Sequence, residues 1–107
     1  MLTALAAQTQ NVGVVAQVFC MGYRNPAMLV KSAITIDHVS DGRLVLGAGW
    51  YEREYKALGI PFPPAPTRME ILEEWVQIVR SMLTQEETTF IGKHYRVEGA
   101  LCYPRPV

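Results

Sequence analysis

The sequence is poor in cysteine, histidine and net charge, and each shortage argues against a class of protein. Cys20 and Cys102 are the two cysteines and lie far apart, which is unlike a disulfide framework. His38 and His94 have no cysteine or histidine neighbour at ligand spacing, so no metal site is predicted. The formal net charge is zero, so we expect no electrostatic binding of nucleic acid.

Long apolar runs are also missing. No apolar stretch reaches the roughly 18 residues that a membrane-spanning helix needs. The N-terminus lacks a basic region followed by a long apolar core, so no secretory signal is expected. Hydrophobic residues make up 50% of the chain, which is too many for disorder. We therefore expect a folded cytoplasmic protein with no membrane partner.

The most informative segment is Asp41–Glu52. Residues 44–46 are apolar without alternation, which predicts a strand buried on both faces, as in a parallel sheet. Gly47 and Gly49 remove side chains where this strand ends, so a ligand or another backbone can approach closely. Trp50 and the tyrosine after it add flat apolar surface. The segment is typical of one wall of a cofactor pocket.

Two features of this segment have alternative interpretations. The Gly-x-Gly sequence could begin a dinucleotide fingerprint, but Glu52 occupies the place of the third glycine. The glycines could instead allow close packing, contact a cofactor, or do both. Glu52 could be a proton donor or substrate anchor, because Trp50 and Tyr51 would raise its pKa. Alternatively, residues 52–54 are the solvated first turn of a short helix.

The order of predicted elements indicates an α/β fold. Residues 1–9 are expected to be the end of a helix, and residues 14–19 a buried strand. Asn25 followed by Pro26 predicts the start of a helix that runs to about residue 40. With the strand from Arg43, these segments form a parallel βαβ unit.

The second half of the chain is predicted to be mainly helical. A short helix is expected over residues 52–58. Capping-box spacing between Thr67 and Glu70 predicts the start of a long helix. Its apolar stripe includes Trp75 and Val76, and Glu74 is expected to face water. Residues 88–90 and 94–97 flank a Gly-Lys pair and predict a hairpin. Two core strands cannot close a sheet, so the pattern is that of a segment of a larger fold.

A set of motifs occurs in a characteristic order along the chain. These are Tyr23–Ala27, Asp37–Arg43, Gly47–Tyr55, Gly59–Pro64, Arg68 and Thr89–Tyr95. Together they resemble the bacterial luciferase-like monooxygenase superfamily, particularly its deazaflavin (coenzyme F-420) dependent oxidoreductase branch. The resemblance implies a partial TIM (β/α)8 barrel, with residues 1–107 as a fragment of a single barrel domain: about two β/α units, the third and fourth, plus a hairpin insertion.

The resemblance also implies a cofactor and a site. Hydride transfer with coenzyme F-420, or oxygen activation with FMN as the alternative, would act on a small organic substrate. A non-proline cis peptide is implied near the end of the first strand, within residues 17–20. Phe19, Cys20, Gly49 and Trp50 are the implied cofactor-binding residues, and Glu52 is the implied catalytic residue.

Two other hypotheses remain open at this point. The chain could be a truncated, non-catalytic fragment that self-associates through open sheet edges or pairs with a complementing barrel fragment. It could also be a small nucleotide-binding βαβ domain, but no complete phosphate loop is visible. A homo-oligomer is therefore expected alongside the small-molecule substrate.

Overall fold

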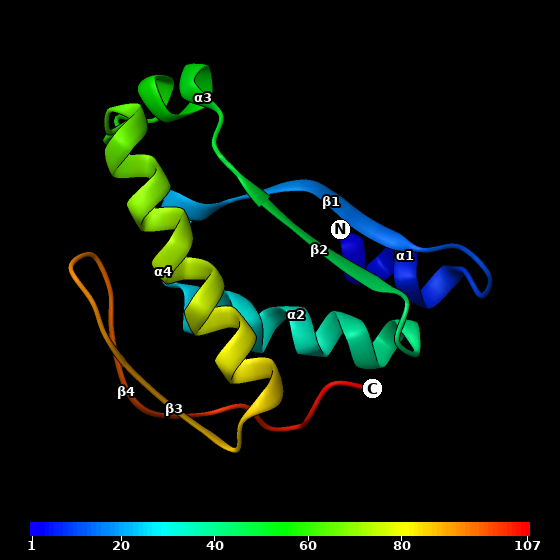
Figure 1. Ribbon diagram of the computed structural model, residues 1–107. Coiled ribbons are helices and arrows are strands. Elements are labelled where there is room, and N and C mark those ends of the chain that lie inside the picture. Colours follow the sequence, from blue (N-terminus) through cyan, green and yellow to red (C-terminus); the bar gives the residue numbers. More distant parts are fainter.

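The computed structural model describes residues 1–107 and contains two small sheets joined by helices (Figure 1). The hairpin lies on the opposite side of the longest helix from the parallel sheet. The elements in order are α1 (Leu2–Gln8), β1 (Val14–Cys20), a 3-10 turn (Met21–Tyr23), α2 (Pro26–Ser40), β2 (Leu44–Gly49), α3 (Glu52–Ala57), α4 (Ala65–Thr84), β3 (Glu87–Ile91) and β4 (Arg96–Leu101).

The predicted βαβ unit is confirmed. β1 and β2 pair in parallel, from Val14 opposite Leu44 to Cys20 opposite Gly49. The register shifts between Ala16 and Phe19. A non-proline cis peptide joins residues 17 and 18, inside the range that the family resemblance implied. One βαβ unit therefore brings the carboxyl ends of β1 and β2 side by side.

Local signals set both ends of α2. The Asn25 side-chain oxygen accepts a hydrogen bond from the Ala27 amide at 2.9 Å, and Pro26 is the first helical residue, as predicted. At the other end Asp41 takes the left-handed conformation with φ of 55°, and its amide N–H bonds to carbonyls of the last turn. The chain then turns directly into β2.

Arg43 lies one residue before β2, and its side chain connects α1 to the end of α2. Its guanidinium donates to the carbonyl oxygens of Ala6 at 2.8 Å, Thr9 at 2.7 Å and Val12 at 2.6 Å. Its Nε donates to the Ser40 carbonyl at 2.6 Å. The bonds to Ala6 and Thr9 satisfy carbonyls at the end of α1, where the Thr9 hydroxyl also donates to the Leu5 carbonyl at 2.8 Å.

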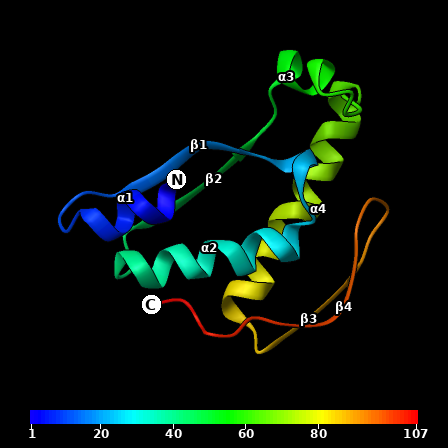
Figure 2. The same cartoon turned by 180° about the vertical axis from the view of Figure 1, so that it is seen from behind.

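The prediction that both faces of the parallel strands are buried is wrong. Val15 and Val45 are 51% and 57% exposed, whereas Val14 is only 5% exposed. The covered face packs against helices, and no element of the chain packs over the other face (Figures 1 and 2). A continuous apolar run shows that a strand can be buried on both faces, but the cover itself must come from other elements.

The predicted capping box of α4 is also wrong. The helix begins at Ala65, after Pro64, and no side chain caps it. Pro66 lies within the first two helical positions, where its fixed φ favours the helix and its missing amide costs nothing. Thr67 and Glu70 therefore lie inside the helix, and the Glu70 carboxylate binds the side chains of the hairpin turn instead.

One apolar core holds α2, α4 and the hairpin together. Trp75 is buried on α4 as predicted, whereas Val76, predicted on the same stripe, is 48% exposed. The predicted hairpin is confirmed, with longer strands than expected. None of the helices is both long and apolar enough to cross a bilayer. The core residues are Met21, Leu29, Val30, Ile34, Trp75, Ile78, Val79, Met82, Val97 and Cys102.

Candidate functional site

The carboxyl ends of β1 and β2 lie side by side and carry two adjoining depressions. Cys20 ends β1 opposite Gly49, which ends β2. Ligands of parallel α/β folds bind at this edge, because the loops that follow the strands converge there. The depressions have volumes of about 320 Å³ and 390 Å³. They form the candidate site.

Three of the predicted cofactor-binding residues line these depressions. Phe19 lines the first, Trp50 lines the second, and Cys20 lines both. Both cysteines are free; Cys20 is partly exposed and Cys102 is buried. The first depression is lined by Val18, Phe19, Cys20, Tyr23, Arg24, Leu29 and Glu54, and the second by Gln17, Val18, Cys20, Trp50, Tyr51 and Glu54.

The two glycines of β2 serve close packing of the strands. A Cβ atom on Gly49 would lie 2.9 Å from Cγ2 of Val18, and one on Gly47 would lie 2.9 Å from the Ala16 carbonyl oxygen. Real Cβ atoms do not approach other atoms so closely, so both positions need glycine in this arrangement. The packing interpretation is confirmed, whereas cofactor contact at Gly49 stays a prediction.

Glu52 faces water rather than the depressions. Its side chain is 57% exposed, and a carboxylate oxygen accepts a hydrogen bond from Lys56 Nζ at 2.6 Å. This bond and the Lys56 charge lower the pKa of Glu52. The predicted rise in its pKa is therefore wrong, because an ammonium one helical turn away outweighs the apolar neighbours. The four-residue spacing of Glu52 and Lys56 in the sequence is typical of such an ion pair on a helix.

Glu54 is the acidic residue that lines the site, and the sequence reasoning missed it. It lines both depressions beside Cys20. Loss of solvent around the phenol raises the pKa of Tyr23, and the nearby Glu54 carboxylate and Cys20 thiol raise it further. Helical periodicity could have distinguished Glu54 from Glu52. Residues 52 and 56 share one face of α3, and residue 54 lies on the opposite face.

An aromatic cluster supports the site from behind. Tyr55 is fully buried, and its hydroxyl oxygen accepts a hydrogen bond from the Gly22 amide at 2.6 Å. Burial raises the pKa of Tyr55, with the Gly22 bond acting in the opposite direction. Its ring centroid lies 5.4 Å from that of Trp50 and 5.8 Å from that of Phe62. These contacts fix the Trp50 ring at the site.

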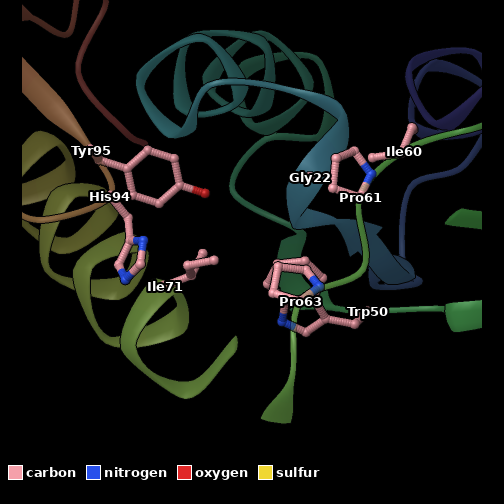
Figure 3. A pocket seen from close by; sticks show the side chains of 8 residues that line it. All are labelled: Gly22, Trp50, Ile60, Pro61, Pro63, Ile71, His94 and Tyr95. Carbon is pink, nitrogen blue, oxygen red and sulfur yellow. The ribbon is translucent and has the colours of Figure 1, made fainter. Parts of the chain in front are cut away.

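A third cavity has a volume of about 240 Å³ (Figure 3). Trp50 lines both this cavity and the second depression, so one indole ring is part of two different walls. The cavity is lined by Gly22, Trp50, Ile60, Pro61, Pro63, Ile71, His94 and Tyr95.

Known proteins resemble the chain along nearly its whole length. It is 30% identical over 106 residues to an FMNH(2)-dependent dimethylsulfone monooxygenase of Pseudomonas putida, covering 97% of this chain and 29% of the relative. It is 32% identical over 104 residues to an F-420-dependent glucose-6-phosphate dehydrogenase of Kineococcus radiotolerans, covering 95% of this chain and 31% of the relative. The chain thus spans about a third of the length of these relatives.

Solved structures show the same fold. The coenzyme F-420 dependent tetrahydromethanopterin reductase of Methanopyrus kandleri superposes with a TM-score of 0.88 at 20% identity, over 98% of this chain and 34% of that one. The monooxygenase RslO1 of Streptomyces bottropensis superposes with a TM-score of 0.82 at 25% identity, over 98% of this chain and 32% of that one. The α/β fold of this chain therefore matches about a third of a luciferase-like TIM-barrel protein.

A family model agrees with these similarities. The model for luciferase-like monooxygenases matches residues 1–107, which include both strand ends and the depressions between them. Because the match covers every residue of the chain, it includes the site as well as the scaffold. The chain belongs to the luciferase-like monooxygenase family.

Proposed function

We propose that this chain forms part of a flavin- or deazaflavin-dependent oxidoreductase that acts on a small organic substrate. Coenzyme F-420 is the preferred cofactor, and FMN is the alternative. The observation that carries the proposal is the pair of depressions at the carboxyl ends of β1 and β2, between Cys20 and Trp50. Relatives named for F-420 and for FMNH(2) dependence support it. Residues 1–107 are the third and fourth β/α units of the barrel in this proposal.

The residues of the depressions fit a flat heteroaromatic ring. Val18, Phe19 and Trp50 offer apolar surface for the ring faces, and Cys20 lies between them. Arg24 and Glu54 sit at the polar edge of the first depression, where ring nitrogens and oxygens can find a donor and an acceptor. Gly49 lets Val18 lie flat against β2, which keeps the apolar wall free of a protruding side chain.

Hydride transfer, or activation of oxygen with FMN, is chemistry that the bound cofactor supplies. In the proposed site Trp50 and Phe19 exclude water from the ring, and Arg24 orients it. The Glu54 carboxylate is a proton acceptor beside the Tyr23 phenol. The pKa of Tyr23 is raised, which keeps the phenol protonated. Glu52, proposed as catalytic, does not line the depressions. Its pKa is lowered, so it would act as an ionised anchor for a part of the substrate that extends beyond them.

We further infer that the exposed face of β1 and β2 is covered in the working protein. Val15 and Val45 are more than half exposed on this face. Parallel sheets are normally covered on both sides, because their strands are apolar on both sides. The cover is a second copy of the chain or a complementing barrel fragment.

A cofactor titration tests the proposal. Purified chain is titrated with coenzyme F-420 and separately with FMN while cofactor fluorescence and light scattering are followed. Saturable binding at micromolar cofactor by a species of defined mass is expected, with F-420 tighter than FMN. Absence of saturable binding for both cofactors, in a preparation of defined mass, would contradict the proposal.

A matched pair of variants locates the binding. Trp50→Ala removes the largest apolar wall and is expected to weaken F-420 binding by at least about tenfold, in line with the 1–3 kcal/mol of a stacked ring. Tyr103→Ala removes an exposed ring far from the depressions, and its affinity should stay that of the parent chain. Equal affinities of the two variants would place the cofactor elsewhere.

A further inference from the structure

The third cavity is formed by segments that are distant in sequence. Gly22 follows β1, Trp50 follows β2, and residues 60–63 connect α3 to α4. Ile71 projects from α4, and residues 94–95 belong to the turn between β3 and β4 (Figure 3). The cavity therefore exists only in the folded chain, and Trp50 separates it from the strand-end depressions.

One wall of the cavity is held rigidly by acidic residues of α4. The Glu74 carboxylate accepts hydrogen bonds from the amides of Lys93 at 2.7 Å, His94 at 2.9 Å and Tyr95 at 2.9 Å. A Glu70 carboxylate oxygen lies 2.8 Å from His94 Nε2. Tyr95 is thus placed before any ligand arrives, which lowers the entropic cost of binding.

The opposite wall is equally constrained. The Gly22 amide donates to the buried Tyr55 hydroxyl at 2.6 Å. A Cβ atom on Gly22 would lie 2.6 Å from Cε1 of Tyr55, so this wall has no room for a larger residue. Pro61 and Pro63 have fixed φ angles on the adjoining side. The cavity cannot be filled by a small shift of these segments.

The chemistry of the lining favours a neutral ligand that carries a hydrogen-bond acceptor. The Tyr95 hydroxyl points into the cavity and makes no hydrogen bond to another protein atom (Figure 3). Burial raises the pKa of Tyr95, so its hydroxyl is a neutral donor. No lysine, arginine or carboxylate side chain lines the cavity, and His94 is already bound to Glu70. A charged ligand would therefore find no free, oppositely charged side chain among the lining residues.

We propose that this cavity binds a small neutral organic molecule with an apolar ring and one carbonyl oxygen. The Tyr95 hydroxyl donates to the carbonyl oxygen, and the ring packs against Trp50, Pro63 and Ile71. The site is separate from the proposed cofactor site, and its ligand needs no cofactor to bind.

Three probes of similar shape test the proposal on the isotope-labelled chain. Acetophenone has the ring and the carbonyl oxygen, ethylbenzene lacks the oxygen, and benzoate carries a negative charge. Amide resonances are followed by NMR during each titration. Acetophenone should shift the amides of Gly22, Ile71 and Tyr95 and saturate with a dissociation constant on the order of 1 mM or below. Ethylbenzene should bind about three- to tenfold more weakly, and benzoate should not saturate.

Tyr95→Phe isolates the hydroxyl. It should weaken acetophenone binding about three- to tenfold and leave ethylbenzene unchanged, because only the hydrogen bond is removed. Tyr103→Phe makes the same chemical change at an exposed tyrosine outside the cavity and should change neither affinity. The proposal is overturned if acetophenone shifts amides elsewhere, if it fails to saturate, or if Tyr95→Phe leaves its affinity unchanged. Because the two sites are separate, a failure of the chain to bind F-420 would contradict the proposed function but not this proposal.

Discussion

At the scale of single residues, Arg43 has a larger structural role than any other charged side chain of the chain. It is part of a motif, yet its side chain satisfies carbonyls of α1 and α2 rather than a ligand. An arginine suits this task because its planar group donates in several fixed directions, which a lysine cannot do. Its position also defines where β2 begins.

Arg43→Ala should lower the free energy of unfolding by about 2–4 kcal/mol, because charge-assisted hydrogen bonds to several partly buried carbonyls are lost. Arg43→Lys should recover only part of the loss. Urea unfolding followed by circular dichroism measures both. Arg53→Ala, at an exposed arginine without hydrogen bonds to the protein, is the control and should change stability by less than about 0.5 kcal/mol. Equal effects of Arg43→Ala and Arg53→Ala would contradict this role.

The ionisation of Glu52 is a second test at the residue scale. The Lys56 ammonium lowers the pKa of Glu52, so carbon-13 NMR of its carboxyl group should give a value below the ordinary 4.3 or so. Lys56→Met should raise that value toward the ordinary one. A pKa of Glu52 above the ordinary value would restore the proton-donor interpretation and show that the pair with Lys56 does not persist.

At the scale of elements, Glu74 attaches the hairpin to α4. It was expected to face water, because its position lies off the apolar stripe of the helix. Its carboxylate instead receives three amides of the β3–β4 turn. Gly92 permits this approach, since a Cβ atom there would lie 2.5 Å from the Glu74 carboxylate. A carboxylate off the apolar stripe of a helix can therefore accept hydrogen bonds from a neighbouring turn. Helical periodicity does not predict such contacts.

Stability of the hairpin should depend on pH through Glu74. Partial burial raises the pKa of Glu74, but the amide hydrogen bonds outweigh this and leave the pKa lowered. A lowered folded-state pKa gives stability that is fully present above the unfolded value of about 4.3 and is lost as pH falls through the folded value. The protection factors of the Lys93 to Tyr95 amides, which correct the exchange rates for the intrinsic effect of pH, should therefore fall below about pH 4.3.

Glu74→Gln is the matched variant. It keeps the shape of the side chain but removes its charge, so it should cost about 1–3 kcal/mol at pH 7 and flatten the pH dependence of these protection factors. Glu73→Gln, at the exposed neighbouring position, should change neither quantity. If the parent chain and Glu74→Gln share one pH profile, the turn does not depend on this carboxylate.

Elements with strong local signals were predictable from the sequence, and those set by packing were not. The Asn25–Pro26 pair defines the start of α2 because both residues act on the adjacent amides. The start of α4 was misplaced because a capping-box pattern was preferred over prolines that also favour a first turn. The same limit applies to the site. The family resemblance implied Cys20, and Trp50 follows a predicted strand end; both line the depressions. The choice between Glu52 and Glu54 depends instead on how α3 packs.

At the scale of the whole molecule, the open face of the parallel sheet is the main departure from expectation. Val15 and Val45 are exposed there, although their sequence context is that of a fully buried strand. Apolar surface in a continuous strand pair favours association, because burying it removes water from aliphatic side chains. The same surface lies next to the proposed cofactor site, so covering it would also enclose the site.

Self-association should follow from this face. Light scattering of the parent chain is expected to give a mass above the 12.0 kDa of one copy, increasing with concentration. Val45→Lys should reduce the mass toward that of one copy, since a charge in the covered face is costly to bury. Met28→Lys places the same charge on an exposed residue of α2 and should have no effect. A mass of one copy at all concentrations would show that the face stays open.

The most direct test of the central claim is to locate the cofactor on the chain. Amide resonances of the labelled chain are followed while coenzyme F-420 is added. The account predicts saturating shifts at Val18, Phe19, Cys20 and Trp50, with the β3–β4 hairpin unchanged. Shifts confined to the hairpin, or no saturating shift at the ends of β1 and β2, would contradict the assignment of this edge as the flavin or deazaflavin site.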